Sequence, residues 1–142
     1  ELFDIQEPKI YVSGLNPHAG ENGMLGKEEI NIIKPAIDTL VEKKGWSITG
    51  PLSADTMFYR QMRSKYDLAV CMYHDQALIP IKTVFFNEAI NITLGLPIIR
   101  TSPDHGTAHD IAGKNLASPT SLINAIRMAK KLTDNKALYE NR

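Results

Sequence analysis

The stretch YDLAVCMYHDQ, residues 66–76, decides the fold class of this chain. Residues 66–73 are almost wholly apolar, as is typical of a central parallel strand that is buried on both faces of its sheet. A histidine and an aspartate follow at once. We therefore predict a buried strand here, with polar side chains just beyond its carboxyl end, where open α/β sheets bind their ligands.

Strand-like and helix-like segments alternate on either side of this stretch. The β-branched and aromatic run at residues 9–14 predicts a strand, and so does the short run at 46–50. Apolar residues recur at helical spacing over 27–44, which predicts a helix that Pro35 kinks. Alternation of this kind is typical of the α/β class.

Weaker signals predict the remaining elements. They are a helix near residues 57–63 with Ser53 or Asp55 as its cap, a short helix disturbed by Pro80, strands at 90–95 and 97–102, a polar loop at 103–119, and a helix at 120–132 that buries Leu122, Ile123, Ile126 and Met128. A charged tail follows the last helix.

Composition narrows the functional classes. A length of 142 residues suits one domain, and 16 basic side chains balance 16 acidic ones, so no net charge favours nucleic acid or an anionic membrane. No apolar run approaches the ~18 residues of a membrane span. Cys71 has no second cysteine to pair with, and we predict an inert thiol in a reducing compartment. We expect a soluble, cytoplasmic protein with a small-molecule partner.

His18 and His74 are candidate metal ligands. Each follows a predicted strand, His18 within LNPHAGENG (residues 15–23) and His74 within MYHDQ (72–76). Neutral imidazole is a good ligand for divalent transition metals. A single loop histidine is more often a surface residue or a helix cap. The hypothesis that both histidines bind one metal rests on their matched positions after two predicted strands.

Two aspartates occupy comparable positions after strands. Asp55 and Asp75 can orient a ligand histidine, bind metal or accept a proton. Helix capping is the alternative for both, because aspartate is a favoured cap and each precedes an apolar periodic stretch.

Three polar residues, Lys82, Asn91 and Arg100, follow one another at intervals of nine. On neighbouring elements they would converge on one anionic group, which arginine can contact in bidentate fashion. A solvated strand edge is the alternative for each of them. The glycines of DHGTAHDIAGK, residues 104–114, allow close approach of a ligand, but the motif by itself indicates only a loop.

Four blocks of the sequence, taken together, resemble the 4-hydroxythreonine-4-phosphate dehydrogenase family of pyridoxal phosphate biosynthesis. They are GLNPHAGENG (14–23), GPLSADTMF (50–58), MYHDQALIPIK (72–82) and NITLGLPIIRTSPDHGTAHDIAG (91–113), and the resemblance runs from about Lys9 to Leu132. It implies an isocitrate/isopropylmalate dehydrogenase-like α/β/α fold. It also implies oxidation of 4-hydroxy-L-threonine 4-phosphate by NAD, or alternatively NADP, with decarboxylation to 3-amino-2-oxopropyl phosphate and the help of zinc, magnesium or cobalt.

The resemblance assigns roles residue by residue. His18 and His74 match metal ligands; Lys82, Asn91 and Arg100 match substrate-binding positions; Asp55 and Asp75 match positions lining the pocket; and His105, Gly106, Thr107 and Ala108 fall in a loop like the adenosine-binding loop of isocitrate and isopropylmalate dehydrogenases. We expect Asp55 to contact substrate, and Asp75 and Lys82 to take part in catalysis.

The resemblance also implies that part of the site lies elsewhere. The family's chain is longer, its N-terminal part carries a third ligand histidine and further substrate contacts, and its site is shared between two subunits. We expect residues 1–142 to be the C-terminal portion of such a chain, to form a homodimer and to be inactive alone. The alternatives are a dehydrogenase for another phosphorylated four-carbon hydroxy acid, an inactive metal-binding fragment, and a metal-dependent hydrolase, which leaves the glycine loop unexplained.

Overall fold

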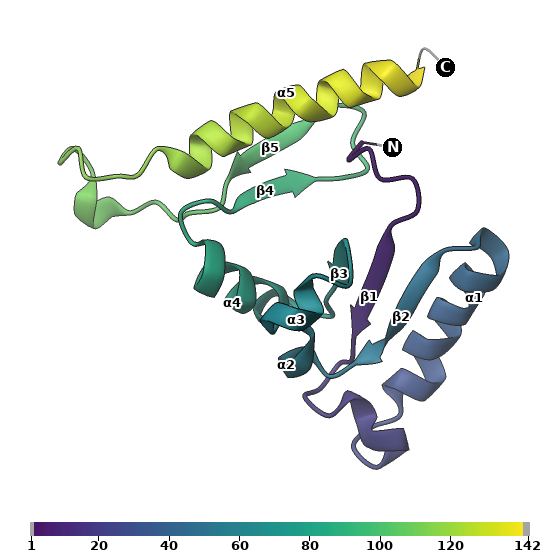
Figure 1. Ribbon diagram of the computed structural model, residues 1–142. Coiled ribbons are helices and arrows are strands. Elements are labelled where there is room, and N and C mark those ends of the chain that lie inside the picture. The colour runs from purple at the N-terminus through teal and green to yellow at the C-terminus, as the bar shows by residue number, and fades with distance from the viewer. Residues whose placement is uncertain (1, 141–142) are drawn as a thin grey trace. The chain divides into compact units, whose positions relative to one another are not determined.

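A computed structural model describes residues 2–140, which divide into two compact units (Figure 1). The three-stranded unit comprises residues 6–80, and the two-stranded unit comprises residues 2–5 together with 81–140. Each unit has its own small sheet, and each holds part of the predicted site.

The sheet of the three-stranded unit is parallel. It consists of β1 (Lys9–Ser13), β2 (Ser47–Leu52) and β3 (Leu68–Val70) in the order β2-β1-β3. Ile10 of β1 is in register with Ile48 on one side and Leu68 on the other. Parallel strands joined through helices confirm the predicted α/β class.

The predicted helix at 27–44 exists, but its first part is not α-helical. Residues Glu29–Ile33 form a π-helical turn, η2, and Lys34–Lys44 form α1. Pro35 lies in the first turn of α1, just after the change from π-helical to α-helical backbone, and its missing N–H removes one donor from this continuous helical segment. Gly45 ends the helix in the left-handed conformation, and its N–H donates to Val41 O.

The core of this unit lies between α1 and the sheet. Ile37 of α1 packs with Ile10 and Val12 of β1, and Ile33, Ile48 and Met72 contact this cluster. Burying apolar side chains against the central strand is the main source of stability for such a layer.

The prediction that residues 66–73 form the central strand, buried on both faces, is wrong for the part of the chain that the structure describes. β3 is three residues long and lies at an edge of the sheet, with Leu68 49% and Val70 39% exposed. The central strand is β1. An apolar run indicates that burial is favourable, but strand order depends on contacts made far away in the sequence.

The helix predicted near 57–63 is two short helices, α2 (Ala54–Met57) and α3 (Arg60–Arg63). Ser53 occupies the N-cap position of α2, yet its side chain makes no capping hydrogen bond. Asp55 lies inside the first turn and is not the cap. Of the two predicted caps, Ser53 is therefore correct in position, without a capping bond from its side chain, and Asp55 is wrong.

The two-stranded unit pairs β4 (Ile90–Thr93) with β5 (Arg100–Pro103) in antiparallel register. Helix α4 (His74–Phe85), which contains Pro80, precedes them, and the predicted loop contains a short 3₁₀ turn, η3 (His109–Ile111). Helix α5 (Thr120–Glu140) runs along the strand pair (Figure 1).

Helix α5 is longer than predicted and buries a different face. It continues through the charged segment to Glu140, where Lys130 pairs with Asp134 and Lys136 with Glu140 at i,i+4 spacing. Its buried residues are Ser121, Ala125 and Leu132. The prediction that Leu122, Ile123, Ile126 and Met128 are buried is wrong: Met128 is half-buried, and the other three are 49%, 41% and 63% exposed.

The antiparallel pair needs small side chains where α5 crosses it. Thr101 of β5 donates a hydrogen bond from Oγ1 to Ala125 O at 2.9 Å, which brings the helix backbone close to the strand. A leucine at position 125 would hold the two apart.

Within residues 2–140, no helix is both long and apolar enough to cross a bilayer.

Candidate functional site

The turn that carries His18 is built around Asn16. Its Oδ1 accepts hydrogen bonds from the N–H groups of His18 (3.0 Å) and Gly20 (3.1 Å), and its Nδ2 donates to Leu25 O at 2.7 Å. The side chain thereby replaces the missing backbone partners of a chain that turns sharply. Gly20 has a φ of 76°, in the left-handed region that glycine adopts without strain.

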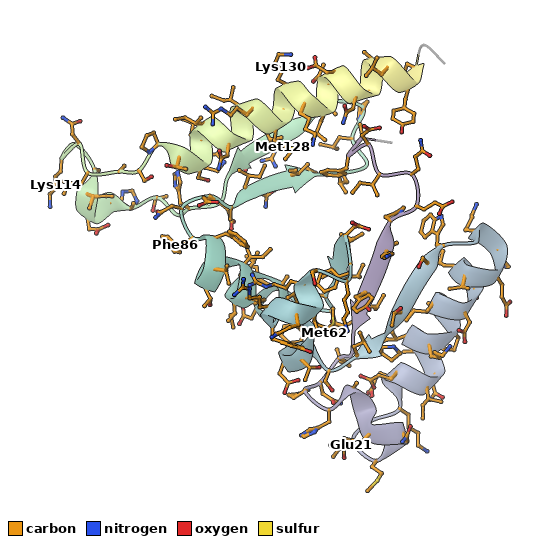
Figure 2. All side chains as sticks on the ribbon, in the orientation of Figure 1. Glu21, Met62, Phe86, Lys114, Met128 and Lys130 are labelled. Carbon is orange, nitrogen blue, oxygen red and sulfur yellow. The ribbon has the colours of Figure 1, made fainter. Side chains whose placement is uncertain are left out.

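The imidazole of His18 projects from this turn. Its Nδ1 lies 3.4 Å from Glu21 Oε1, and the side chain is 60% exposed. Glu21, labelled in Figure 2, marks the position of the turn. A carboxylate beside Nδ1 favours the tautomer whose Nε2 lone pair is free to bind a ligand.

His74, in the first turn of α4, also has a carboxylate beside Nδ1, and here the two groups are at hydrogen-bond distance. Its Nδ1 lies 2.7 Å from Asp75 Oδ1, and its side chain is 78% exposed. Histidines that bind metals commonly hold a carboxylate on the other ring nitrogen in this way. The prediction that Asp75 can orient His74 agrees with this geometry.

The chemistry of these two donors fits a divalent transition metal, but they do not complete a site. His18 and His74 follow β1 and β3, which are neighbouring parallel strands, so both turns leave the same edge of the sheet. No group of three or more His, Cys, Asp or Glu side chains within the described residues is arranged to hold a metal. Catalytic zinc sites usually take three protein ligands.

Asp55 and Asp75 both line one pocket of about 310 Å³ in the three-stranded unit. The remaining lining residues are Ala54, Phe58, Tyr73, Gln76, Ile79 and Pro80. Both carboxylates are exposed rather than paired with a buried cation. The pocket therefore presents two acidic groups above an apolar wall.

Sequence reasoning missed Gln76, which lines this pocket and is only 7% exposed. Its Oε1 accepts hydrogen bonds from Ser13 Oγ (2.5 Å) and Met72 N (2.8 Å), and its Nε2 donates to Gly14 O at 2.8 Å. These bonds join the start of the His18 turn to the turn before His74. The only signal in the sequence is a glutamine two positions after a candidate ligand.

Sequence reasoning also missed Glu29, which is 4% exposed under the His18 turn. Its Oε1 accepts a hydrogen bond from Leu15 N at 2.8 Å, whereas Oε2 has no hydrogen-bond partner. The turn is packed tightly around the carboxylate: a Cβ on Gly20 would lie 2.6 Å from Oε2. Nothing local in the sequence distinguishes Glu29 from its exposed neighbour Glu28.

Cys71 lies at the carboxyl end of β3, beside this network. Burial raises the pKa of its thiol above the ordinary value, and a hydrogen bond with Ser13 opposes the shift. A thiol held protonated is a poor nucleophile. This agrees with the predicted inert cysteine, although the side chain is half-buried rather than fully enclosed.

Lys82, in the two-stranded unit, is paired with Asp104. Its Nζ donates a hydrogen bond to Asp104 O at 3.0 Å and lies 3.7 Å from Asp104 Oδ2. The lysine side chain is 36% exposed and the aspartate 14%. Lys82 is therefore held near the start of the glycine loop, with its side chain partly exposed.

Asn91 and Arg100 lie on the same face of the β4–β5 pair. Residues directly opposite each other share a face, and the register pairs Asn91 with Ser102 and Thr93 with Arg100. Arg100 Nη1 donates a hydrogen bond to Thr93 Oγ1 at 2.8 Å. This face is opposite the one from which Thr101 contacts α5, so the two predicted substrate-binding residues are exposed together.

The predicted cofactor loop is exposed throughout, at His105, Gly106, Thr107 and Ala108. Figure 2 shows that the segment around Lys114 extends away from the strand pair. His105 Nδ1 lies 3.0 Å from Gly106 O, and Ala108 has a left-handed φ of 48°. A Cβ on Gly106 would meet no atom within 4 Å, so packing within the described chain does not require glycine there.

Comparisons with known proteins place the chain in a family. The sequence profile of the pyridoxal phosphate biosynthetic protein PdxA matches residues 1–129. The chain is 64% identical over 130 residues to a 4-hydroxythreonine-4-phosphate dehydrogenase of Bradyrhizobium diazoefficiens, which covers 92% of this chain and 37% of that protein. It is 60% identical over 127 residues to the enzyme of Roseobacter denitrificans, covering 89% of this chain and 39% of that one.

Solved structures agree. The fold is similar to 4-hydroxythreonine-4-phosphate dehydrogenase from Klebsiella pneumoniae, with a TM-score of 0.75, 46% identity, and coverage of 92% of this chain and 40% of that one. It is also similar to a terephthalate 1,2-cis-dihydrodiol dehydrogenase from Burkholderia xenovorans, with a TM-score of 0.68, 35% identity, and coverage of 92% and 41%. The chain thus spans about 40% of the length of the relatives it matches. It belongs, as its four sequence blocks predicted, to the family of the pyridoxal phosphate biosynthetic protein PdxA.

Proposed function

We propose that this chain is part of an enzyme that oxidises 4-hydroxy-L-threonine 4-phosphate with NAD, or alternatively NADP, and decarboxylates the product to 3-amino-2-oxopropyl phosphate. One observation carries the proposal. Two exposed imidazoles, each with a carboxylate on Nδ1, follow neighbouring parallel strands in a chain 64% identical to a 4-hydroxythreonine-4-phosphate dehydrogenase.

The three-stranded unit supplies the metal-binding groups. His18 and His74 present Nε2 to a divalent ion such as zinc, magnesium or cobalt, and Asp75 orients His74. When bound, the metal lowers the pKa of the substrate hydroxyl, and the nicotinamide accepts the hydride. The remaining coordination positions are filled by substrate, by water or by groups outside residues 2–140.

The two-stranded unit supplies the substrate-binding groups. Arg100 and Lys82 offset the negative charge of the phosphorylated acid, and Asn91 donates a neutral hydrogen bond from the same face as Arg100. The exposed backbone of residues 105–108 allows close approach of the cofactor. Asp55 and Asp75 line one pocket. Asp55 contacts the substrate there, and Asp75 accepts a proton.

The assembled enzyme is a homodimer with an isocitrate/isopropylmalate dehydrogenase-like fold and a shared active site. His18 and His74 supply two donors, whereas catalytic zinc sites usually take three protein ligands, so the proposal places the remaining donors in the rest of the enzyme. It also leads us to expect that the 142-residue chain alone is inactive, since groups that act as a unit are lost together.

The test is NADH formation by the complete protein that the gene encodes, with 4-hydroxy-L-threonine 4-phosphate and added zinc, magnesium or cobalt. Turnover is expected, and the 142-residue chain should show none. His74→Gln should weaken metal binding, whereas His109→Gln should leave metal affinity unchanged. Parent-like turnover by the short chain would contradict the shared site, and no turnover by the complete protein would contradict the proposed substrate.

A second candidate is oxidation of another phosphorylated four-carbon hydroxy acid. The similarity to a protein named for a different substrate, a terephthalate dihydrodiol, is the reason to test more than one substrate. A panel of erythronate, threonate and hydroxythreonine phosphates, compared by kcat/KM, separates the two. If neither the complete protein nor the short chain oxidises any of them but both bind metal, the chain is a metal-binding module.

A further inference from the structure

We propose that Gln76 is a positioning residue that holds the His18 and His74 turns at a fixed separation. The inference rests on the proposed function, in which both imidazoles bind one metal. It goes further, because it assigns the alignment of the two turns to the side chain of Gln76. None of the three hydrogen bonds of this side chain is to an imidazole.

The hydrogen bonds of Gln76 admit only one orientation of its amide. Oε1 faces the N–H of Met72 (2.8 Å) and the hydroxyl of Ser13 (2.5 Å), both donors, while Nε2 faces Gly14 O (2.8 Å), an acceptor. Rotating the amide by half a turn would place nitrogen against nitrogen and oxygen against oxygen. The side chain is therefore locked in place by groups on both turns.

Each bond fixes a residue close to a candidate ligand. Met72 lies two positions before His74, and Gly14 lies four positions before His18. Gln76 itself follows His74 by two positions, in the first turns of α4. The network thus bridges segments separated by 62 residues of sequence, close to the ends of the neighbouring strands β1 and β3.

Burial makes this hydrogen-bond network sensitive to the loss of any one partner. Ser13 is fully buried, and Gln76 is 7% exposed, so water cannot replace a lost partner without rearrangement. Gln76→Glu keeps the shape of the side chain but places a carboxylate oxygen against Gly14 O. Two acceptors repel each other, so either the carboxyl group must take up a proton or the turns must separate to admit water.

The alternative is that Gln76 merely stabilises the fold, as buried glutamines commonly do. Metal affinity distinguishes the two roles. Groups that orient metal ligands typically change metal affinity about 10- to 100-fold when they are replaced. A group with a purely structural role lowers the unfolding temperature but leaves the affinity of the folded protein unchanged.

The experiment compares four forms of the complete encoded protein: wild type, Gln76→Glu, Ser13→Ala and the matched control Gln61→Glu, whose side chain is exposed on α3. Cobalt(II) titration, followed by visible absorption, reports metal affinity. Amide hydrogen exchange of the metal-free protein, read on peptides covering residues 14–24 and 71–77, reports the order of the two turns.

For Gln76→Glu we expect cobalt affinity to fall about 10- to 100-fold and exchange to speed up in both peptides. Ser13→Ala removes one of the three bonds, so it should shift both measurements in the same direction by a smaller factor, and it serves if Gln76→Glu does not fold. Gln61→Glu should match wild type in both.

Two results would overturn the inference: exchange in Gln76→Glu and Ser13→Ala that stays at wild-type rates in either peptide, or faster exchange with unchanged cobalt affinity. Failure of the proposed function is distinguishable, because it appears in the wild-type titration. If the wild-type protein binds no cobalt, the metal-binding proposal is wrong and the positioning of a metal by Gln76 is overturned with it, whatever the exchange rates show.

Discussion

Arg100 and Thr93 are joined across the β4–β5 pair by a hydrogen bond of 2.8 Å from the guanidinium Nη1 to the threonine hydroxyl. The bond holds the cation on the exposed face that also carries Asn91. A guanidinium held by a neutral hydroxyl keeps its full charge and most of its donors for an anion. This relationship makes Arg100 the best-oriented substrate-binding candidate in the two-stranded unit.

Arg100→Gln should raise KM for the phosphorylated substrate about 10- to 100-fold, because a charge-assisted hydrogen bond contributes about 1.5–3 kcal/mol. Steady-state kinetics of the complete protein measure this. Thr93→Val, which removes only the orienting hydroxyl, should raise KM less. Arg127→Gln, an equivalent change on the exposed surface of α5, is the control. An unchanged KM in Arg100→Gln would exclude the residue from the substrate site.

Gly106→Ala should weaken cofactor binding and leave the stability of the protein nearly unchanged. A Cβ at this position has no neighbour within 4 Å, so the unfolding free energy should change by no more than about 0.5 kcal/mol. If the loop packs against the cofactor, the added methyl should raise KM for NAD about tenfold, the effect expected for overpacking a contact. Thermal unfolding and NAD kinetics are the two measurements. An unaltered KM for NAD would argue against cofactor contact at Gly106.

Gly50→Ala should destabilise the three-stranded unit. Gly50 has a φ of 154°, and a Cβ there would lie 2.5 Å from Val12 O and 2.9 Å from Val12 Cβ on the central strand. The obstructing atoms belong largely to backbone, so β1 and β2 must move apart, at a cost of about 1–3 kcal/mol or more. Urea unfolding monitored by circular dichroism measures the change. If Gly50→Ala is as stable as wild type, the prediction is wrong, because β1 and β2 then move apart at no cost in free energy.

Leu132→Ala and Leu138→Ala form a matched pair on α5. Leu132 is fully buried, so its truncation should cost about 2–5 kcal/mol, whereas Leu138 is 63% exposed and should cost less than about 0.5 kcal/mol. Both substitutions leave helix propensity nearly equal, which isolates burial as the cause. Equal losses of stability in the two variants would contradict the assignment of the buried face of α5.

Much of the candidate site follows from local sequence. The β-branched run of residues 9–14, the glycines around His18 and the Gly45 helix stop each reflect a preference of a few neighbouring residues, and the structure has elements at all three places. The same holds for the placement of His18 and His74 directly after strands. Their approach to a common metal stays a prediction.

Helix α5 shows where local patterns fail. Its periodic apolar residues predicted a buried face that included Leu122 and Ile126, yet the helix turns Ala125 and Leu132 toward the strands. Thr101 bonds to Ala125 O, so the inward face is one on which a small side chain lets the helix backbone approach the strand.

By itself, then, the sequence determined the class of the fold, the family and the identity of the polar residues at the strand ends, because these depend on residue type and on neighbours along the chain. Only the tertiary structure decided that β1 is central, that Gln76 reaches Gly14 across 62 residues, and that Glu29 is buried under the His18 turn. The physical reason is that strand order and buried polar contacts arise from groups distant in sequence, whose meeting no local preference encodes.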